Sequence, residues 1–218
     1  MYSVEMPSIN ENIEFHKVDG RSGSLTERTG TYDDRVFKYG FDLKRKRNES
    51  LEDFSERLFY VEEALSDCIG KDLVYFSNKN YKYVVKNIKI DTTEDTLCHD
   101  IQLEIICEPF RYLSFEDTVL LTKPQSIFYK GSVPGECKIR IYGSGNVQLT
   151  INRETLEIRN IDEFIEIDSK LGEILNKTGD SIVKNTNGNF LILARGTNNI
   201  DWIGNVEKVE ILPRTAFK

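Results

Sequence analysis

Histidine, tryptophan and methionine are scarce in this sequence, with two, one and two residues among 218. The two histidines, His16 and His99, fall in no Ser/His/Asp pattern and in no metal-ligand spacing. The phosphate-loop pattern, in which a glycine-rich loop ends in Gly-Lys followed by Ser or Thr, is also absent. The sequence therefore offers no catalytic set, and we expect neither enzymatic activity nor a cofactor.

Cysteine pairs and long apolar runs are missing as well. The four cysteines, Cys68, Cys98, Cys107 and Cys137, form no Cys-x-x-Cys motif, and no secretory signal is visible. We therefore expect buried or half-buried thiols in a reducing cytoplasm rather than disulfides. A zinc site built from Cys98, His99 and Cys107 is the alternative, but adjacent residues of a strand point to opposite faces. No segment reaches the about 20 apolar residues that a bilayer span needs, so no membrane association is expected.

Positive charge is in deficit, because 29 lysines and arginines face 36 aspartates and glutamates, a formal net charge of −7. Binding to a nucleic-acid backbone needs a basic face, so this balance argues against that function. The concentrated positive run is Lys44-Arg45-Lys46-Arg47. It can contact nucleic acid or an acidic partner, or it can form a solvated connection between a strand and a helix. The absence of interleaved aromatic residues favours the connection.

One amphipathic helix is predicted at about residues 50–66. Ser50 is a suitable N-cap with Asp53 three residues later, and Gly70 is a natural stop. Apolar residues recur at spacings of three and four, which places them on one face. These residues are Leu51, Phe54, Leu58, Val61 and Leu65. A stripe this short fits a helix lying on a sheet better than a coiled coil.

Strands are predicted on both sides of the helix. The segment 32–43 alternates loosely, and Gly40 is expected to mark a bulge. Its two sides are expected to carry Val36 with Phe41, and Phe37 with Tyr39. Further strands are predicted at 72–76, 81–90 and 101–110, with a bulge near Asn87 and an inward face of Ile101, Leu103, Ile105 and Cys107.

The second half of the chain reads as β structure throughout. A boundary near residue 120 is expected to divide the chain into domains 1–120 and 121–218. Two strands are predicted around a turn at Gly143-Ser144-Gly145-Asn146, and the run 190–194, apolar on both faces, is predicted as a central strand. Other short strands are predicted at 155–158, 164–168 and 206–212. This spacing indicates a β-sandwich, so the fold class is mainly β, with an α+β first domain.

Two features admit more than one interpretation. The early segment Val18–Leu25, VDGRSGSL, is compatible with a phosphate cradle, a flexible linker or a shaped loop. No helix follows Gly23, so no helix N-terminus faces an anion and the phosphate interpretation fails. Trp202, the single tryptophan, can be a platform that stacks on a sugar ring, but a place in the core or at its rim is favoured.

The sequence resembles the distal tail protein (Dit) family of bacteriophages with long, non-contractile tails and of their prophage relatives. The N-terminal resemblance is carried by VDGRSGSL followed by Gly30-Thr31-Tyr32-Asp33. The C-terminal resemblance is carried by FIEIDSK, by GNFLILARGTNNI (188–200) and by ILPR (211–214). These fragments occur in order over nearly the whole chain.

The resemblance implies a structural protein of the virion, made in the host cytoplasm. In this family an N-terminal β-rich domain with one helix closes into a six-membered ring, and a galectin-like β-sandwich lies at the periphery. The ring caps the tail tube and holds the tail-associated lysin and receptor-binding components, while DNA passes through its lumen. The loop with Gly20, Arg21, Gly23 and Leu25 then becomes the candidate subunit contact, because its glycines permit turns that shape a reaching loop.

A second hypothesis is a carbohydrate-binding module that recognises cell-wall glycans, with Trp202 as the stacking residue. A galectin-type pocket needs a set of His, Asn, Arg and Glu around its tryptophan. The second half contains no histidine, and Ile203-Gly204-Asn205 follows the tryptophan. Fold similarity does not carry function with it, so the C-terminal domain is expected to be structural or to serve docking.

Overall fold

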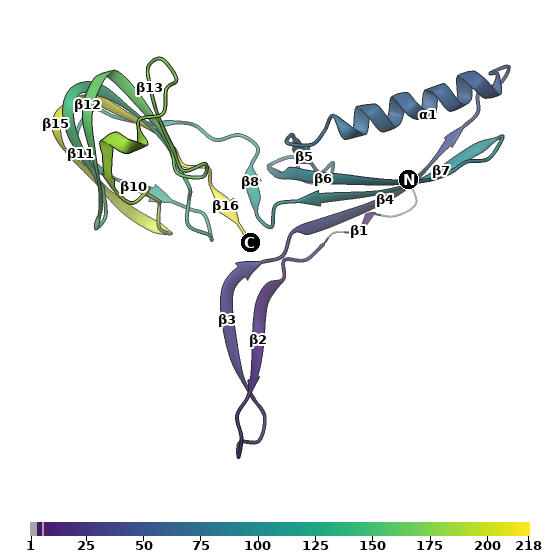
Figure 1. Ribbon diagram of the computed structural model, residues 1–218, viewed down its shortest axis with the longest axis horizontal. Coiled ribbons are helices and arrows are strands. Elements are labelled where there is room, and N and C mark those ends of the chain that lie inside the picture. The colour runs from purple at the N-terminus through teal and green to yellow at the C-terminus, as the bar shows by residue number, and fades with distance from the viewer. Residues whose placement is uncertain (1–3, 6) are drawn as a thin grey trace. The chain divides into compact units, whose positions relative to one another are not determined.

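The computed structural model describes residues 4–5 and 7–218, and the chain divides into two compact units, Met1–Arg111 and Tyr112–Lys218. Both units consist mainly of strands, as predicted (Figure 1). The division falls before the expected boundary at residue 120, because β9 (Val119–Leu121) pairs with β15 (Gly196–Leu212) of the second unit. No helix among the described residues is long and apolar enough to cross a membrane.

The first unit contains a sheet, one helix and a separate two-stranded hairpin. The sheet has the order β1-β4-β7-β6, with β5 paired to β6, and the hairpin is β2-β3. The elements are β1 Val4–Glu5, β2 Glu11–Lys17, β3 Ser24–Tyr32, β4 Arg35–Lys44, α1 Leu51–Ser66, β5 Asp72–Val74, β6 Tyr81–Thr93 and β7 Cys98–Cys107.

The helix α1 begins and ends where the sequence predicts. The Ser50 hydroxyl accepts a hydrogen bond from the Asp53 backbone N–H at 3.0 Å, which caps one of the unpaired donors of the first turn. Phe54 and Leu58 are buried on the side of α1 that faces the sheet. The run Lys44–Arg47 connects β4 to α1, and within it the Arg45 guanidinium donates to the Glu49 carbonyl at 2.8 Å.

The sheet of the first unit confirms one predicted bulge and contradicts the other. The β6–β7 register shifts between Val85 and Asn87, as predicted, whereas the β4–β7 register runs unbroken from Arg35 to Lys44. The predicted bulge at Gly40 is therefore wrong, and Phe41 lies on the same side as Phe37. The buried face of β7 is the predicted one, Ile101, Leu103, Ile105 and Cys107, extended by His99.

The second unit is built on one sheet that is folded over its own core. The sheet order is β10-β15-β11-β12-β13, with β14 paired to β12 and β9 to β15, while β16 pairs with β8. The elements are β8 Arg111–Leu113, β9 Val119–Leu121, β10 Gln125–Tyr129, β11 Lys138–Ile151, β12 Glu154–Asp168, β13 Glu173–Asn176, a 3₁₀ turn Val183–Asn185, β14 Thr186–Gly188, β15 Gly196–Leu212 and β16 Ala216–Phe217.

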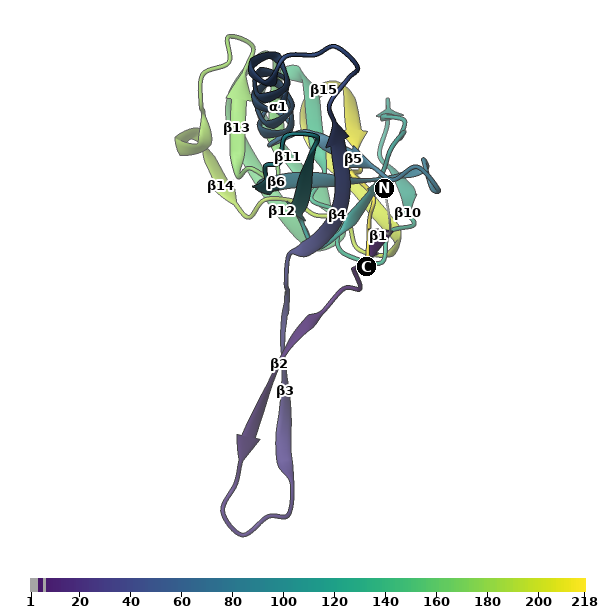
Figure 2. The same cartoon turned by 90° about the vertical axis from the view of Figure 1, so that its right-hand side faces the viewer.

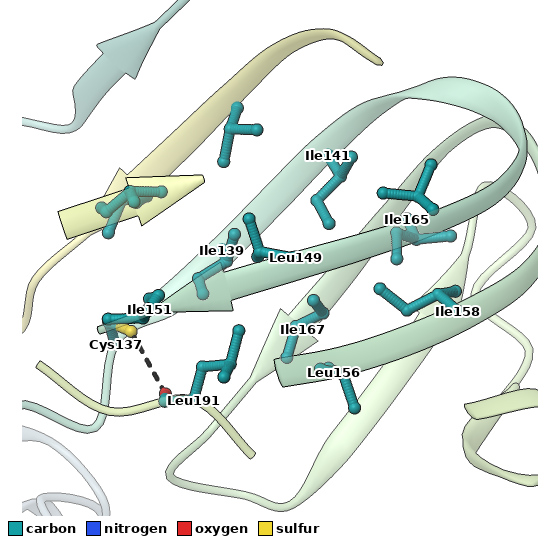
Figure 3. Packing of buried hydrophobic residues seen from close by; sticks show 14 of the residues in the cluster. Cys137, Ile139, Ile141, Leu149, Ile151, Leu156, Ile158, Ile165, Ile167 and Leu191 are labelled. Carbon is teal, nitrogen blue, oxygen red and sulfur yellow. Dashed lines mark hydrogen bonds between the residues drawn. The ribbon is translucent and has the colours of Figure 1, made fainter. Parts of the chain in front are cut away.

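The predicted turn at residues 143–146 is wrong, because β11 runs through it as one strand with a bulge. The β11–β12 register shifts between Gly145 and Val147, and the strand bends there instead of reversing. Gly143 permits the bend, since a Cβ at this position would collide with the Asn205 carbonyl on β15. Both halves of β11 then face the same apolar core, with Ile139 and Ile141 before the bulge and Leu149 and Ile151 after it (Figure 3).

The run Phe190–Ala194 was predicted as a central strand, and this prediction is wrong. The segment forms only one isolated bridge, between Leu193 and Gly135. Leu191 and Leu193 are nonetheless completely buried, so the apolar run covers the core without joining the sheet. Side chains satisfy the Leu191 carbonyl instead. The Cys137 thiol donates to it at 3.5 Å (Figure 3), and the Ser169 hydroxyl donates to it at 2.7 Å.

A half-buried ion pair fixes the C-terminal segment of this unit. The Arg214 guanidinium donates to both oxygens of Asp168, each at 2.6 Å. One oxygen of Asp168 also accepts the backbone N–H groups of Lys170 and Leu171. Burial alone would raise the pKa of the Asp168 carboxyl, but these hydrogen bonds and the Arg214 charge outweigh it and lower the pKa.

Candidate assembly interface

The early glycine-rich segment lies at the tip of a hairpin that the sequence did not predict. Strands β2 and β3 pair antiparallel, from Glu11 opposite Tyr32 to Lys17 opposite Ser24, with a register shift between Glu11 and Ile13. Figure 2 shows the two strands running side by side to the loop, away from the helix and sheet of the same unit. The hairpin is therefore a sheet of its own, separate from the packed part of the unit.

Three of the four candidate contact residues lie in the loop, and the fourth lies near the start of β3. Gly20 and Gly23 have positive φ values of 76° and 84°, which other residues resist. Arg21 lies between them, and its backbone N–H donates to the Val18 carbonyl at 3.2 Å. Leu25 is the second residue of β3 and is 42% exposed. The four residues are thus gathered at one end of the hairpin.

The hairpin has no core of its own. None of its residues from Glu11 to Tyr32 is buried, and the apolar residues among them are well exposed. Ile13 is 43% exposed, Phe15 68% and Val18 45%. A two-stranded hairpin without a covered face is at best marginally stable in water. Exposed apolar side chains on an unpaired sheet are typical of a surface that another chain covers.

The two faces of the hairpin differ in character. Cross-strand pairing places Ile13 with Arg28, Phe15 with Thr26 and Lys17 with Ser24 on one face. This face, which we call the basic face, is apolar with two cations, of which Arg28 pairs with Glu11. The opposite face, which we call the acidic face, carries the pairs Glu14 with Glu27 and His16 with Leu25.

The acidic face contains a group that has metal-ligand composition. Glu14, His16 and Glu27 each offer a ligand atom, and these atoms lie within 4.8 Å of one another. The His16 Nε2 is 2.9 Å from Glu27 and 3.6 Å from Glu14, so the imidazole sits between two carboxylates that the register places opposite each other. All three side chains are exposed. Nothing beyond these three groups indicates an ion.

The three residues of the zinc hypothesis all lie on β7, but the structure does not bring them together at one site. Cys98 and His99 alternate in burial along β7, as adjacent strand residues do, and Cys107 lies at the other end of the strand. The His99 ring stacks on Phe54 of α1 with centroids 3.9 Å apart. Neither ring nitrogen of His99 has a hydrogen-bond partner among the described residues. This histidine is therefore part of the packing between helix and sheet.

Trp202 lies on β15 opposite Leu149 and packs, half-buried, against the core of the second unit. A more open polar surface covers the outer side of β11, β12 and β15 in the same unit. There Arg140 donates to Glu166 at 2.7 Å, and its guanidinium lies over the Phe164 ring. Tyr142 donates to Glu210 at 3.2 Å. A shallow hollow of about 180 Å³ lies on this side, lined by Thr118, Lys138, Arg140, Glu166, Glu210 and Leu212.

The charges on this outer surface are held by their neighbours. Hydrogen bonds from Lys138 and Arg140 outweigh the burial of Glu166 and lower the pKa of its carboxyl. A hydrogen bond from Lys208, with a second from Tyr142, lowers the pKa of Glu210. Both carboxyls are therefore ionised acceptors near neutral pH, and the lysines and arginine that could bind an anion are already paired with them.

Comparison with known proteins places the fold. A match to a solved structure covers 96% of this chain and 91% of the other, with a TM-score of 0.71 and 12% sequence identity. That structure is the crystal structure of the SPP1 Dit protein (gp 19.1), described as a paradigm of the hub adsorption apparatus in phages that infect Gram-positive bacteria. No protein-family model matches the chain, and no curated protein sequence matches it. The resemblance to the Dit family is thus confirmed at the level of the fold.

Proposed function

We propose that this chain is a structural hub protein of a phage tail, which assembles as a homo-hexameric ring at the distal end of the tail. The observation that carries the proposal is the shared fold with SPP1 Dit over nearly the full length of both chains. The match covers 96% of this chain, so it extends over both compact units and not over a single β-sandwich alone.

The hairpin β2-β3 provides the subunit contact in this proposal. A ring forms when one surface of a subunit binds a different surface of the next and the rotation closes. The exposed hairpin, with Gly20, Arg21, Gly23 and Leu25 at its tip, is suited to reach a neighbour. Its lack of a core is then resolved on assembly, because Phe15 and Ile13 become buried against the adjacent subunit.

The proposed partners follow from the position at the tail tip. The ring joins the tail tube protein on one side and the tail-associated lysin or baseplate hub on the other, and receptor-binding proteins attach around it. DNA passes through the lumen without sequence-specific binding, and the net charge of −7 disfavours its adhesion. The galectin-like second domain serves docking. The protein acts without catalysis and is a component of the virion.

Light scattering and electron microscopy of the purified chain test this proposal. The full chain is expected to form six-membered rings at high concentration or with its tail partners. A matched variant, in which a short glycine linker replaces residues 12–31, is expected to stay monomeric with an unchanged circular dichroism signal from the rest of the chain. A full chain that remains a monomer at the highest soluble concentration, with its tail partners present, contradicts the proposal.

A second candidate function is recognition of cell-wall glycans by the second unit. The observation that favours it is the outer surface of β11, β12 and β15, where Arg140, Tyr142 and Phe164 combine planar polar groups with aromatic rings. Saturable binding to purified cell walls is expected if this function exists. Trp202→Phe and Arg140→Ala then separate the two possible sites, and absence of saturable binding removes the hypothesis.

A further inference from the structure

The outer side of α1 carries a stripe of carboxylates around two exposed aromatic rings. Helical spacing of three and four residues places six exposed residues on one side, opposite the buried Phe54 and Leu58. These six residues are Glu52, Glu56, Phe59, Tyr60, Glu63 and Asp67. We call them the α1 stripe.

The α1 stripe is not needed for the packing of its own subunit. Phe59 is 63% exposed and Tyr60 is 62% exposed, although both lie on a helix whose other side is firmly buried. Like charges four residues apart, such as Glu52 and Glu56, destabilise an isolated helix. Tyr60 donates to Glu56 at 3.1 Å, and this hydrogen bond, with the charge of Glu63 nearby, raises the pKa of the Tyr60 hydroxyl. The α1 stripe therefore has two aromatic side chains at its centre and carboxylates around them.

The basic face of the hairpin has the opposite composition. It presents Ile13 and Phe15 as its apolar centre, with Lys17 towards the loop, while Arg28, across from Ile13, is paired with Glu11. Arg21 adds a further cation in the loop. A surface of aromatic and aliphatic side chains bordered by cations therefore exists in the same chain as one of aromatic side chains bordered by carboxylates.

We infer that the α1 stripe is the surface that receives the hairpin of the next copy of this chain. In this contact the basic face of the hairpin lies on α1, Phe15 packs against Phe59 and Tyr60, and Lys17 enters among the carboxylates. The inference rests on the proposed ring, and adds to it the receiving surface and the face of the hairpin that is used.

This pairing explains why both surfaces are exposed and why they differ. Aromatic side chains at the centre of a contact contribute most of the binding energy, and opposite charges at its rim set the register. The two surfaces are distinct patches of one chain, so the contact is heterologous and each subunit keeps one of each for its other neighbour. Repetition of such a contact is what a ring requires.

Two variants test the inference by reversing one surface each. The helix variant carries Glu56→Lys and Glu63→Lys, and the hairpin variant carries Phe15→Ser and Lys17→Glu. Each is expected to weaken self-association at least about tenfold relative to the unmodified chain, in sedimentation or light scattering. Matched controls at other exposed positions are Glu94→Lys with Asp95→Lys and, for the loss of an aromatic side chain, Phe115→Ser. The controls are expected to assemble like the unmodified chain.

A mixture of the two variants gives the sharper result. The helix variant retains an intact hairpin and the hairpin variant retains an intact α1 stripe, so one productive contact remains between them. We expect a one-to-one dimer that does not grow further, because its two outer surfaces are both impaired. Rings in the mixture, or no interaction at all, contradict the inference.

The failure of this inference can be told apart from failure of the proposed function. If the unmodified chain forms rings and the helix variant forms them with equal affinity, the hairpin docks elsewhere and only the inference is overturned. If the unmodified chain remains a monomer under every condition, the ring and this contact are both overturned. Circular dichroism of each variant confirms that α1 is still folded.

Discussion

Removal of the Arg214 guanidinium is expected to destabilise the second unit strongly. In the Arg214→Ala variant, Asp168 loses two hydrogen bonds of 2.6 Å and its opposite charge. The aspartate is only 7% exposed, so its carboxylate stays largely out of water without a partner charge. Breaking one side of a buried ion pair in this way costs more than deleting both partners.

The magnitude follows from burial and from the hydrogen bonds that remain. Loss of one partner of a fully buried pair costs about 3–5 kcal/mol. Two features reduce this figure here, since the Arg214 side chain is 24% exposed and Asp168 still accepts the N–H groups of Lys170 and Leu171. We expect a loss of about 2–3 kcal/mol in the free energy of unfolding of this unit.

Urea unfolding followed by tryptophan fluorescence measures this loss selectively. Trp202 is the single tryptophan and packs against the core of the second unit, so its emission reports that unit. With an m-value of about 1–2 kcal/mol/M, the midpoint is expected to fall by about 1–3 M. The matched control is Asp168→Asn combined with Arg214→Ala, which removes the uncompensated charge and is expected to recover part of the loss.

The pH dependence supplies an independent check of the reasoning. The pKa of Asp168 is lowered in the folded state, so its pairing stabilises the fold above the unfolded pKa of about 4 and this contribution is lost as the pH falls through the folded value. The unmodified chain and Arg214→Ala should therefore differ by the full amount in free energy of unfolding at pH 7. This difference should become smaller below about pH 4. A loss under about 0.5 kcal/mol at pH 7, or a difference that does not change with pH, refutes the argument.

Three further predictions concern buried positions. His99→Phe keeps the stack on Phe54 and removes two ring nitrogens without hydrogen-bond partners. The free energy of unfolding of the first unit should therefore rise by about 1–2 kcal/mol, measured by chemical unfolding followed by circular dichroism. A loss of stability would mean that the nitrogens are paired. Gly143→Ala forces a side chain against the backbone of β15 and should lower the free energy of unfolding by about 2 kcal/mol or more, measured by Trp202 fluorescence. An unchanged stability would contradict the close approach of β11 and β15 at Gly143. Burial raises the pKa of Cys107 and of Cys137 to about 12. A thiol reagent at pH 8 should therefore modify these two cysteines only after unfolding. Rapid labelling of all four cysteines in the native chain would disprove their burial.

The parts of the fold that the sequence predicts are those with one buried face. Helix α1 and strand β7 each bury one side against the other element. Their apolar residues, from Phe54 to Leu65 and from Ile101 to Cys107, therefore recur with the period of a helix and of a strand. The hairpin at 11–32 escaped prediction for the converse reason. Both of its faces are exposed within the subunit, so burial imposes no regular pattern on it. Apolar and polar residues alternate only briefly, from Ile13 to His16 in β2, and β3 shows no alternation.

The errors in the second unit come from bends that tertiary packing imposes. Gly143 to Asn146 has the composition of a hairpin turn, yet β15 pairs with β11 on both sides of it, so the strand continues through a bulge. The run Phe190–Ala194 has the composition of a buried strand, but Leu191 and Leu193 are buried by covering the core. Burial fixed the residue types in both places, and long-range pairing, which local composition does not encode, decided the backbone path.

The place of β15 in the sheet matters for a chain that is still being synthesised. This strand lies between β10 and β11, yet it is the last long strand to leave the ribosome. Strands β1, β4, β5, β6 and β7 and helix α1 have all left the ribosome once Cys107 has emerged, so at about 5–20 residues per second they can fold several seconds earlier. During that interval the edge of β11 that later pairs with β15 has no partner strand, and it can pair with another chain and aggregate. A chain that ends before β15 should therefore keep α1 and strands β4, β6 and β7 folded and leave the second unit unfolded.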